Sequence, residues 1–140
     1  MALIKGKSDF TVSLRADMDA LPILEKTDKI YSSCNVGVMH ACGHDVHTAI
    51  VLGAAKILNS MSDELEGNVK LIFQPAEESV EKDGAKKLVE ENVLKNPDVS
   101  AIFGLHVFPE IMSGKAGTRR GHPGICARRR RESVAVHAVP

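Results

Sequence analysis

Positions 40 to 47 form the segment of this chain that is richest in side chains able to bind metals. The segment contains three imidazoles, one thiol and one carboxylate. Two further clusters follow, the adjacent carboxylates of Glu77-Glu78 and the single imidazole of His106. Thiolate, imidazole and carboxylate are the groups with which proteins hold divalent transition metals. Three such clusters at the ends of expected strands indicate a metal-assisted hydrolase rather than a structural zinc module.

The sequence Cys42-Gly43-His44 places two candidate ligands two residues apart. The glycine between them permits a tight turn of the backbone, so the thiol and the imidazole can point the same way. The alternative reading is a buried cysteine beside surface histidines. His47 follows three residues after His44 and can share a helix face with it. His40 has no periodic relation to the others and is expected to be solvated or to support a ligand.

Glu77 and Glu78 directly follow an apolar stretch and Pro75. Adjacent glutamates are usually solvated, but that is less natural directly after a buried strand. Because adjacent side chains diverge, one carboxylate can bind a metal while its neighbour faces the attacking water. A metal lowers the pKa of its bound water to roughly 7, and a carboxylate within hydrogen-bond reach can take the proton.

Asp17 and Asp19 repeat a carboxylate at a spacing of two, which places both on one face if the strand continues. An acidic pair that starts a turn is an equally good interpretation. His106 is a lone histidine in an apolar segment, and such a residue is more often a satisfied core histidine than a ligand. Its place at the end of an expected strand favours the ligand interpretation.

Hydrophobic patterning predicts the elements that position these residues. The expected order is strand 11–16, loop 23–41, a helix of about three to four turns from Val46, strand 68–74, helix 84–94 and strand 99–107. The last strand is nearly continuously apolar, as a strand buried on both faces would be. The Cys42/His44 pair is placed in the loop that enters the first helix.

Strands that alternate with helices predict an α/β fold, here a partial three-layer sandwich with a largely parallel sheet flanked by helices. In such sheets functional groups gather at the carboxyl ends of the strands, so one crevice can hold all the candidate residues.

A length of 140 residues is about one domain. The chain has no apolar run near the roughly 20 residues of a membrane helix, and no secretory leader is expected. Three widely spaced cysteines argue against a disulfide framework, so we expect a cytoplasmic protein.

The net charge of zero conceals two segments of opposite charge. Residues 1–118 contain 12 Lys and Arg against 17 Asp and Glu, whereas residues 119–140 contain six Arg against one Glu. We therefore treat the Arg-rich tail, residues 119–140, separately from the body, residues 1–118. Four adjacent arginines, 128–131, can contact phosphate, but the acidic body makes a poor nucleic-acid surface.

Four ordered blocks resemble the signature blocks of one family. The blocks are 14–22 (LRADMDALP), 39–47 (MHACGHDVH), 73–78 (FQPAEE) and 104–107 (GLHV). They look like the amidohydrolase branch of the aminoacylase/carboxypeptidase-type metallopeptidases, which includes hippurate hydrolases, indole-acetyl-amino-acid hydrolases and N-acetyl-diaminopimelate deacetylases. Members of that branch cleave the amide bond of N-acyl amino acids with two divalent metals. The similarity covers about residues 3–118.

The resemblance implies roles for individual residues. Cys42, His44, Glu78 and His106 fall on metal-ligand positions, and Glu77 falls on the position of the general acid/base. Asp19, with Asp17, matches a block that supports the catalytic site. The resemblance further implies a pair of divalent ions, zinc or manganese with cobalt or nickel as options, and a small N-acyl amino acid as substrate. It implies neither nucleic acid nor membrane as a partner, and leaves homo-oligomers of full-length relatives open.

The chain also departs from the family pattern. Family members are several hundred residues long, start with a helical segment, contain a smaller inserted domain and supply a last histidine ligand near the C-terminus. We therefore expect residues 1–118 to be a partial metal-dependent amidohydrolase catalytic domain and residues 119–140 to be a tail that is loosely ordered or translated out of frame. The product is then expected to be shortened at both ends and nearly inactive alone. The alternative function is a catalytically inactive fragment that at most binds a divalent metal. A third interpretation is a nucleic-acid-binding protein that acts through the arginine tail.

Overall fold

The computed structural model describes residues 1–79, 81–109, 116–119 and 134–138, and for the last two ranges the backbone only. Its elements in chain order are β1 (Ala2–Ile4), β2 (Thr11–Asp17), α1 (His44–Ser60), a short 3₁₀ helix (Ser62–Glu64), β3 (Asn68–Gln74), α2 (Gly84–Glu90), β4 (Ala101–Leu105), β5 (Ala116–Arg119) and β6 (Val134–Ala138). These strands form one sheet in the order β1-β3-β2-β4-β6-β5. The neighbours β3, β2, β4 and β6 run parallel, and β1 and β5 pair antiparallel at the two edges.

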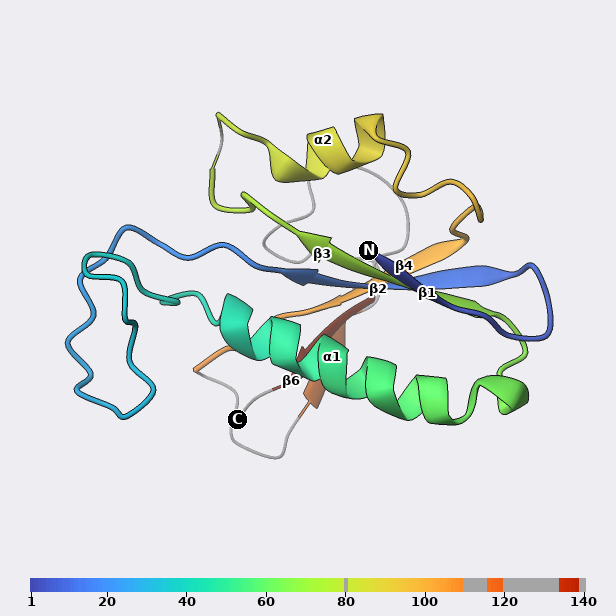
Figure 1. The fold of residues 1–140 in the computed structure, drawn as a ribbon, viewed down its shortest axis with the longest axis horizontal. Helices are drawn as coiled ribbons and strands as arrows, with labels where there is room; N and C mark the ends of the chain where they lie inside the picture. The colour runs from blue at the N-terminus through green and yellow to red at the C-terminus, as the bar shows by residue number, and fades with distance from the viewer. Residues whose placement is uncertain (80, 110–115, 120–133, 139–140) are drawn as a thin grey trace.

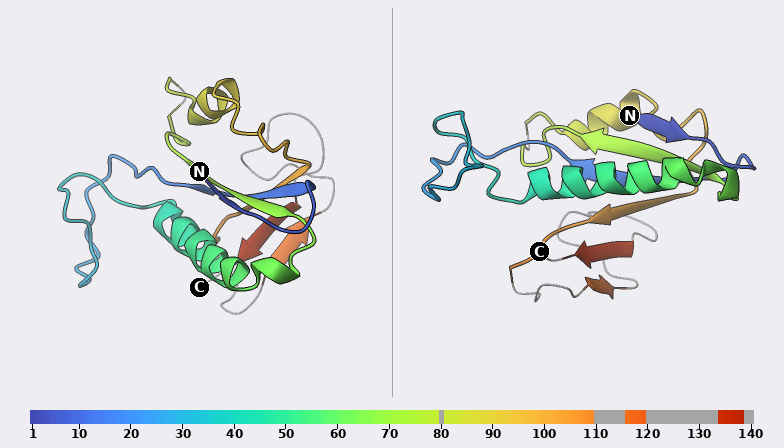
Figure 2. Two further views of the ribbon diagram at one scale, coloured as in Figure 1. Left: turned by 45° about the vertical axis from the view of Figure 1, so that its right-hand side comes forward. Right: turned by 60° about the horizontal axis from the view of Figure 1, so that its bottom comes forward.

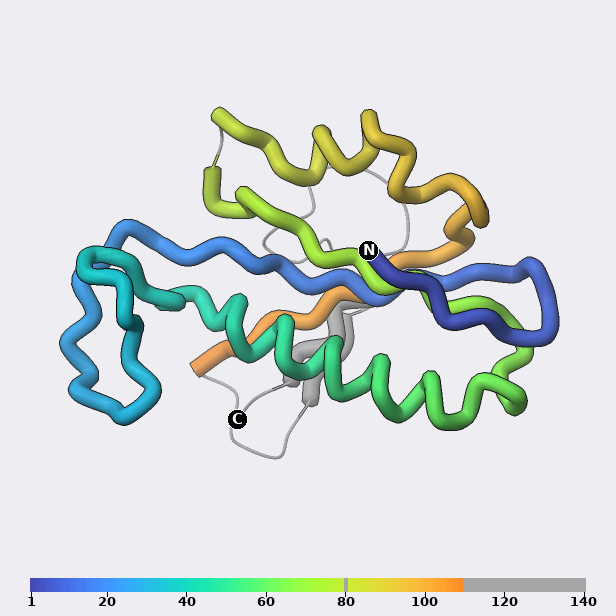
Figure 3. Tube along the Cα trace, in the orientation of Figure 1, coloured from blue at the N-terminus to red at the C-terminus, as the bar shows by residue number. Residues whose placement is uncertain are grey.

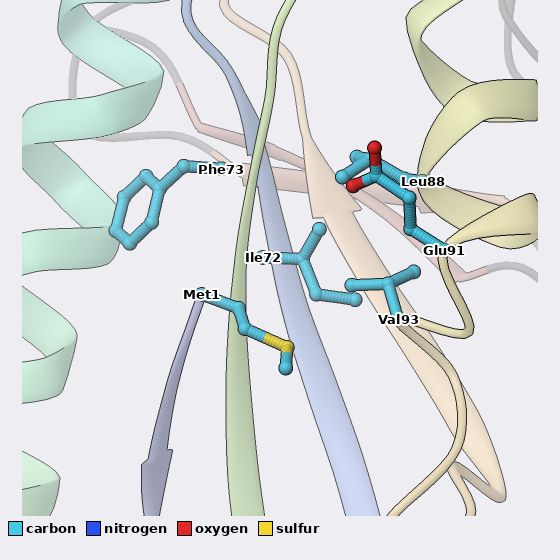
Figure 4. Close-up of a pocket in the computed structure, with 6 residues that line it drawn as sticks. All are labelled: Met1, Ile72, Phe73, Leu88, Glu91 and Val93. Atoms are coloured by element: carbon cyan, nitrogen blue, oxygen red, sulfur yellow. The ribbon is translucent and has the colours of Figure 1, made fainter.

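The two helices lie on opposite faces of this sheet (Figures 1 and 2). Side chains alternate between the two faces along each strand, so β3 sends Phe73 toward α1 and Ile72 toward α2 (Figure 4). Together with the sheet, the helices form three layers. The expected α/β fold, a partial three-layer sandwich around a largely parallel sheet, is therefore confirmed.

The main hydrophobic core lies between the sheet and α1. It consists of the buried side chains of Ile4, Ala16, Val51, Val69 and Leu71. Val12, Leu14 and Leu58 are among the partly buried residues that pack against it. This contact fixes α1 against the central strands, and with it the position of the first helical turn. On the α2 side of β3 a small, largely apolar hollow opens, lined by Met1, Ile72, Phe73, Leu88, Glu91 and Val93 (Figure 4). The ring of Phe73 itself points to the α1 side.

The predicted elements agree with the structure in the centre of the chain and differ at their ends. Strand 68–74 has the predicted bounds, and strand 11–16 extends by one residue to Asp17. Helix α1 begins at His44, two residues before the predicted start, and its 17 residues exceed the expected length. His44 therefore lies in the helix and not in the loop before it. The structure adds β1, for which the sequence pattern gave no prediction.

The predicted bounds of two other elements, α2 and β4, were wrong. Helix α2 stops at Glu90 rather than 94, because Asn92 adopts a left-handed backbone conformation that ends the helix. Strand β4 is shorter than the expected 99–107, and its residues are half-buried rather than buried on both faces. Most of segment 119–140, including arginines 128–131, lies outside the described residues, so the boundary after residue 118 stays a prediction. Among the residues described, no helix is long and apolar enough to cross a membrane.

Lys70 of β3 is a buried cation that fastens the segment after α2 to the sheet. Its side chain is 1% exposed, and its Nζ donates to the carbonyl oxygens of Val93, Lys95 and Pro97 at 3.1, 2.8 and 2.9 Å. Burial lowers the pKa of this ammonium. The three carbonyls replace the water that the ammonium loses. These hydrogen bonds attach the segment that leads into β4 to Lys70 of β3.

We predict that Lys70→Met destabilises the fold by about 1–3 kcal/mol, because the three carbonyls lose a charged donor in a site closed to water. Urea unfolding followed by circular dichroism measures the change in the free energy of unfolding. Lys56→Met, at an exposed position of α1, is the matched control and should leave the midpoint unchanged. Equal midpoints for both variants would contradict a supporting role for the ammonium.

Candidate metal centre

The carboxyl ends of β3, β2 and β4 meet at the same end of the sheet as the first turn of α1 (Figures 1 and 3). Asp17 is the last residue of β2, and His106 follows β4 directly. Glu77 and Glu78 follow β3 by three and four residues. Because these strands are parallel neighbours, their ends bring the candidate residues together, as expected for an α/β sheet.

Gly43 allows α1 to begin at this place. Its φ of 79° lies in the left-handed region, and a Cβ on it would meet Cγ2 of Val107 at 2.4 Å. Glycine alone avoids both the backbone strain and the collision. The start of α1 therefore packs directly against the residue that follows His106, and Cys42 and His44 lie on either side of this contact.

His44 is the most unusual residue of the site. Its side chain is 1% exposed, yet neither Nδ1 nor Nε2 has a hydrogen-bond partner among the residues that the structure describes. Nδ1 lies 3.3 Å from Oδ1 of Asp19. Nε2 faces carboxylate oxygens of Glu78, Asp17 and Glu77 at 3.7, 3.8 and 4.0 Å. A buried nitrogen among carboxylates and without a partner is costly, unless a cation fills the space between them.

Cys42, His44 and Glu78 place their ligand atoms within 4.8 Å of one another. His106 joins them, since its Nε2 lies 3.4 Å from Sγ of Cys42. Its other nitrogen, Nδ1, lies 2.7 Å from the carbonyl oxygen of Val107 and must donate there. This arrangement leaves Nε2 of His106 facing the thiol. The structure thus groups Cys42, His44 and Glu78 and places His106 beside Cys42. The role of all four residues as metal ligands stays a prediction.

A second group of possible ligands, Asp17, His44 and His47, also lies within 4.8 Å. Asp17 and His47 are already bonded to each other, with Oδ1 and Nδ1 2.6 Å apart. Nε2 of His47 accepts the backbone N–H of Val107 at 3.0 Å, and Oδ2 of Asp17 accepts from Arg15 at 2.5 Å. Both residues have their polar atoms occupied, so they support the site and are poor candidates for ligands.

The electrostatic setting favours a bound cation. Burial raises the pKa of the Cys42 thiol to about 12, with added contributions from Glu78, Glu77 and Asp17. Burial alone would raise the pKa of Asp17, but the His47 hydrogen bond and the Arg15 guanidinium lower it to about 2. The site therefore contains ionised carboxylates around a thiol that holds its proton unless a positive charge arrives.

Asp19 is held between His44 and the segment after β3. Its Oδ2 accepts the backbone N–H of Glu78 at 2.9 Å, and its Oδ1 faces His44. Burial opposes ionisation of Asp19, but the backbone N–H groups of Glu78 and Glu77 lower its pKa. An ionised Asp19 is placed to orient the His44 ring. This position fits a supporting group better than a proton-transfer group.

Glu77 and Glu78 occupy different surroundings although they are adjacent. The side chain of Glu77 is 13% exposed and that of Glu78 31% exposed. Among the described residues, Glu78 completes the group with Cys42 and His44, and Glu77 does not. The turn after β3 packs closely against the start of α2, because a Cβ on Gly84 would lie 1.7 Å from the carbonyl oxygen of Pro75. This close approach places both carboxylates beside His44.

The residue types present fit a divalent metal. One thiol, two imidazoles and several carboxylates lie close together, and both nitrogens of the buried His44 ring lack hydrogen-bond partners among the described residues. This donor set suits zinc and other first-row metals. The sequence did not predict the roles of Arg15 and His47 in this arrangement. For His47, its spacing of three from His44 was the available signal. His40 is exposed, in agreement with the solvated interpretation.

Comparison with known proteins identifies the family of the chain. Residues 13–137 match the model of peptidase family M20/M25/M40. The chain is 49% identical over 122 residues to an N-acetylcysteine deacetylase of Bacillus subtilis, covering 86% of this chain and 31% of that protein. It is 56% identical over 110 residues to the IAA-amino acid hydrolase ILR1-like 2 of Arabidopsis thaliana, covering 79% and 24%.

A solved structure agrees with these sequence matches. The Bacillus subtilis YXEP protein, described as a dinuclear metal-binding peptidase of the M20 family, superposes with a TM-score of 0.79 at 48% identity, covering 85% of this chain and 32% of that one. The chain belongs to the peptidase M20/M25/M40 family. It spans about a quarter to a third of the length of these relatives. The resemblance read from the four sequence blocks is therefore confirmed.

We predict that metal affinity rises with pH through Cys42. The raised pKa, about 12, means that the free thiol is protonated at neutral pH, so metal binding must release its proton. At pH values below the raised pKa of the thiol, the apparent association constant should rise about tenfold per pH unit for that one proton. Titration calorimetry with zinc in buffers of different ionisation enthalpy measures both the affinity and the proton released.

The two cysteines of the described residues provide the control. Cys34→Ser, at an exposed position, should keep the pH dependence. Cys42→Ser should weaken binding and abolish this proton release. A variant without the Cys42 thiol that still released the same proton would show that the thiol is not a ligand.

Proposed function

We propose that this chain carries the metal-binding part of an amidohydrolase that cleaves the amide bond of N-acyl amino acids. The observation that carries the proposal is the buried His44 imidazole, whose two nitrogens lack partners and face four carboxylates. Cys42 and His106 complete the donor set around it. A site of this kind suits a metal that activates water for hydrolysis.

The names of the relatives support this substrate class. One relative is called an N-acetylcysteine deacetylase, and another an IAA-amino acid hydrolase. Both names describe removal of an acyl group from the nitrogen of an amino acid. For this chain we propose the shared chemistry, a small N-acyl amino acid, and not a particular acyl group.

Each residue has a defined part in the proposed mechanism. A pair of divalent ions, when bound, supplies Lewis acidity that polarises the scissile carbonyl and lowers the pKa of water. Glu77 accepts the proton of the attacking water and passes it to the nitrogen of the leaving amino acid. Cys42, His44, Glu78 and His106 hold the ions. Asp19 keeps the His44 ring in its orientation.

The proposed ions are zinc or manganese, with cobalt or nickel as further options. The thiol favours zinc, whereas carboxylates and imidazoles also suit the other three. The structural relative described as dinuclear supports two ions. A cytoplasmic location agrees with a free thiol in the site and stays a prediction.

The second candidate function is a catalytically inactive fragment that binds at most one divalent metal. The chain spans 31% of the B. subtilis deacetylase. The nucleic-acid interpretation depends on arginines 128–131, which lie outside the described residues. The acidic character of residues 1–118 argues against it.

We predict that the full chain binds divalent metal through His44. Cobalt titrated into the metal-free protein should give visible absorption from a thiolate-bound ion, and calorimetry with zinc should give the stoichiometry and the affinity. His44→Ala should abolish binding, because it removes the buried nitrogen at the centre of the cluster. His40→Ala, four residues away at an exposed position, should bind as the unchanged chain does.

The outcomes separate the two candidate functions. Two bound ions together with hydrolysis of N-acetylcysteine support the amidohydrolase. Stoichiometric binding of one ion without any hydrolysis supports the inactive fragment. Failure of the folded chain to bind zinc, cobalt or manganese would contradict both.

We predict that Glu77→Gln leaves metal binding intact and removes hydrolysis. The amide cannot accept the proton of water, so the matching substitution in a full-length relative should lower kcat by roughly 10²–10⁴. In this chain the same variant should keep the zinc affinity, whereas Glu78→Gln should weaken it. Loss of metal from Glu77→Gln would show that the roles of the two glutamates are reversed.

A further inference from the structure

His47 lies at the centre of the site without facing its open space. Its side chain is completely buried, and both ring nitrogens are engaged. Because a backbone N–H can only donate, the Val107 N–H requires a lone pair on Nε2 of His47. The single proton of the neutral ring is therefore on Nδ1, where it is donated to Asp17. The contacts alone define this tautomer.

Beyond these two bonds, His47 belongs to a series of side-chain contacts that crosses the sheet. Oδ2 of Asp17 accepts from the Arg15 guanidinium, and Nε of Arg15 donates to Oε1 of Gln74 at 2.9 Å. Gln74 ends β3, Asp17 ends β2, and Val107 follows β4 by two residues. One continuous set of side-chain contacts therefore joins α1 to the ends of three strands.

At the other end of this series of contacts, Val107 sets the orientation of the His106 ring. Its N–H is held by His47, and its carbonyl oxygen lies 2.7 Å from Nδ1 of His106. That carbonyl requires a proton on Nδ1, which leaves Nε2 toward Sγ of Cys42 at 3.4 Å. The rings of His47 and His106 also pack together, with centroids 4.7 Å apart. Rotation of the Val107 backbone would remove this control.

We propose that His47 is a positioning residue, which holds the Val107 backbone so that His106 presents Nε2 to the metal centre, and which holds Asp17 in place. The inference rests on the proposed metal centre. A histidine that only fills the core would stabilise the fold without any effect on the tautomer of His106. The two roles therefore differ in a measurable property of a neighbouring ring.

Two variants separate the two hydrogen bonds of His47. A glutamine places its amide near the position of Nε2, so its carbonyl oxygen can still accept the Val107 N–H. An asparagine places its amide near Nδ1, so it can still donate to Asp17 but cannot reach Val107. Both substitutions put a neutral amide in the same cavity. Each variant retains one of the two bonds, so their comparison shows which of the two bonds sets the state of His106.

The first measurement uses the full metal-free chain. Long-range ¹H–¹⁵N correlation spectra at a pH where the rings are neutral should show a proton on Nδ1 for both His47 and His106. His47→Gln should keep this state of His106, and His47→Asn should shift His106 toward the Nε2–H form. A proton on Nε2 of His47 in the unchanged chain would overturn the proposal. This result does not depend on metal binding.

The second measurement is the affinity for cobalt or zinc. His47→Asn should weaken binding by about 10–100-fold, as loss of a supporting contact to a ligand usually does, and His47→Gln should retain more of it. Circular dichroism and urea unfolding report whether both variants are folded. Equal affinities of the two folded variants, or tighter binding by His47→Asn, would overturn the positioning role. Lack of binding by the unchanged chain would instead contradict the metal centre itself.

If His47→Asn fails to fold, the glutamine variant still decides. A folded His47→Gln supports the role of the Val107 contact if His106 keeps its proton on Nδ1 and the variant keeps its metal affinity. The same variant with His106 in the Nε2–H form, while the amide accepts the Val107 N–H, would overturn it.

Discussion

Burial of an imidazole among carboxylates is the constraint on which this end of the molecule depends. His44 can be buried only if its nitrogens and the surrounding charges are compensated, because such groups are costly away from water. The surrounding residues come from four different elements, so the sheet register, the start of α1 and the turn after β3 must all agree. The left-handed Gly43 and the close approach of Gly84 to Pro75 are local consequences of this requirement.

Part of the fold could be predicted from sequence because hydrophobic period and strand breakers are local signals. Pro75 ends the apolar stretch of β3, and the predicted bounds of that strand match the structure. β1 was beyond such a signal, since three residues are too few to show a period, and only pairing with β3 makes them a strand. The end of α2 depends on the conformation of Asn92, which its residue type permits but does not require.

The candidate ligands could be identified from residue type and spacing, and their supporting contacts could not. Arg15 reaches Gln74 because the parallel register sets Asp17 opposite Gln74. The contact between Arg15 and Gln74 spans 59 positions, which no local pattern encodes. Likewise, the two bonds of His47 link residues 30 and 60 positions away. Sequence motifs thus indicate which groups react, whereas the register decides which groups hold them.

The separation of Cys42 and His106 along the chain has a further consequence. These two side chains meet across 64 positions, and the chain between them contains α1, β3, α2 and β4. An ion shared by them would act as a reversible cross-link, and in the chain-entropy description a link that closes a loop of that length raises the free energy of the unfolded chain by about 4 kcal/mol. Metal uptake and folding would then be one thermodynamic process, and chelation would loosen helices that never touch the ion.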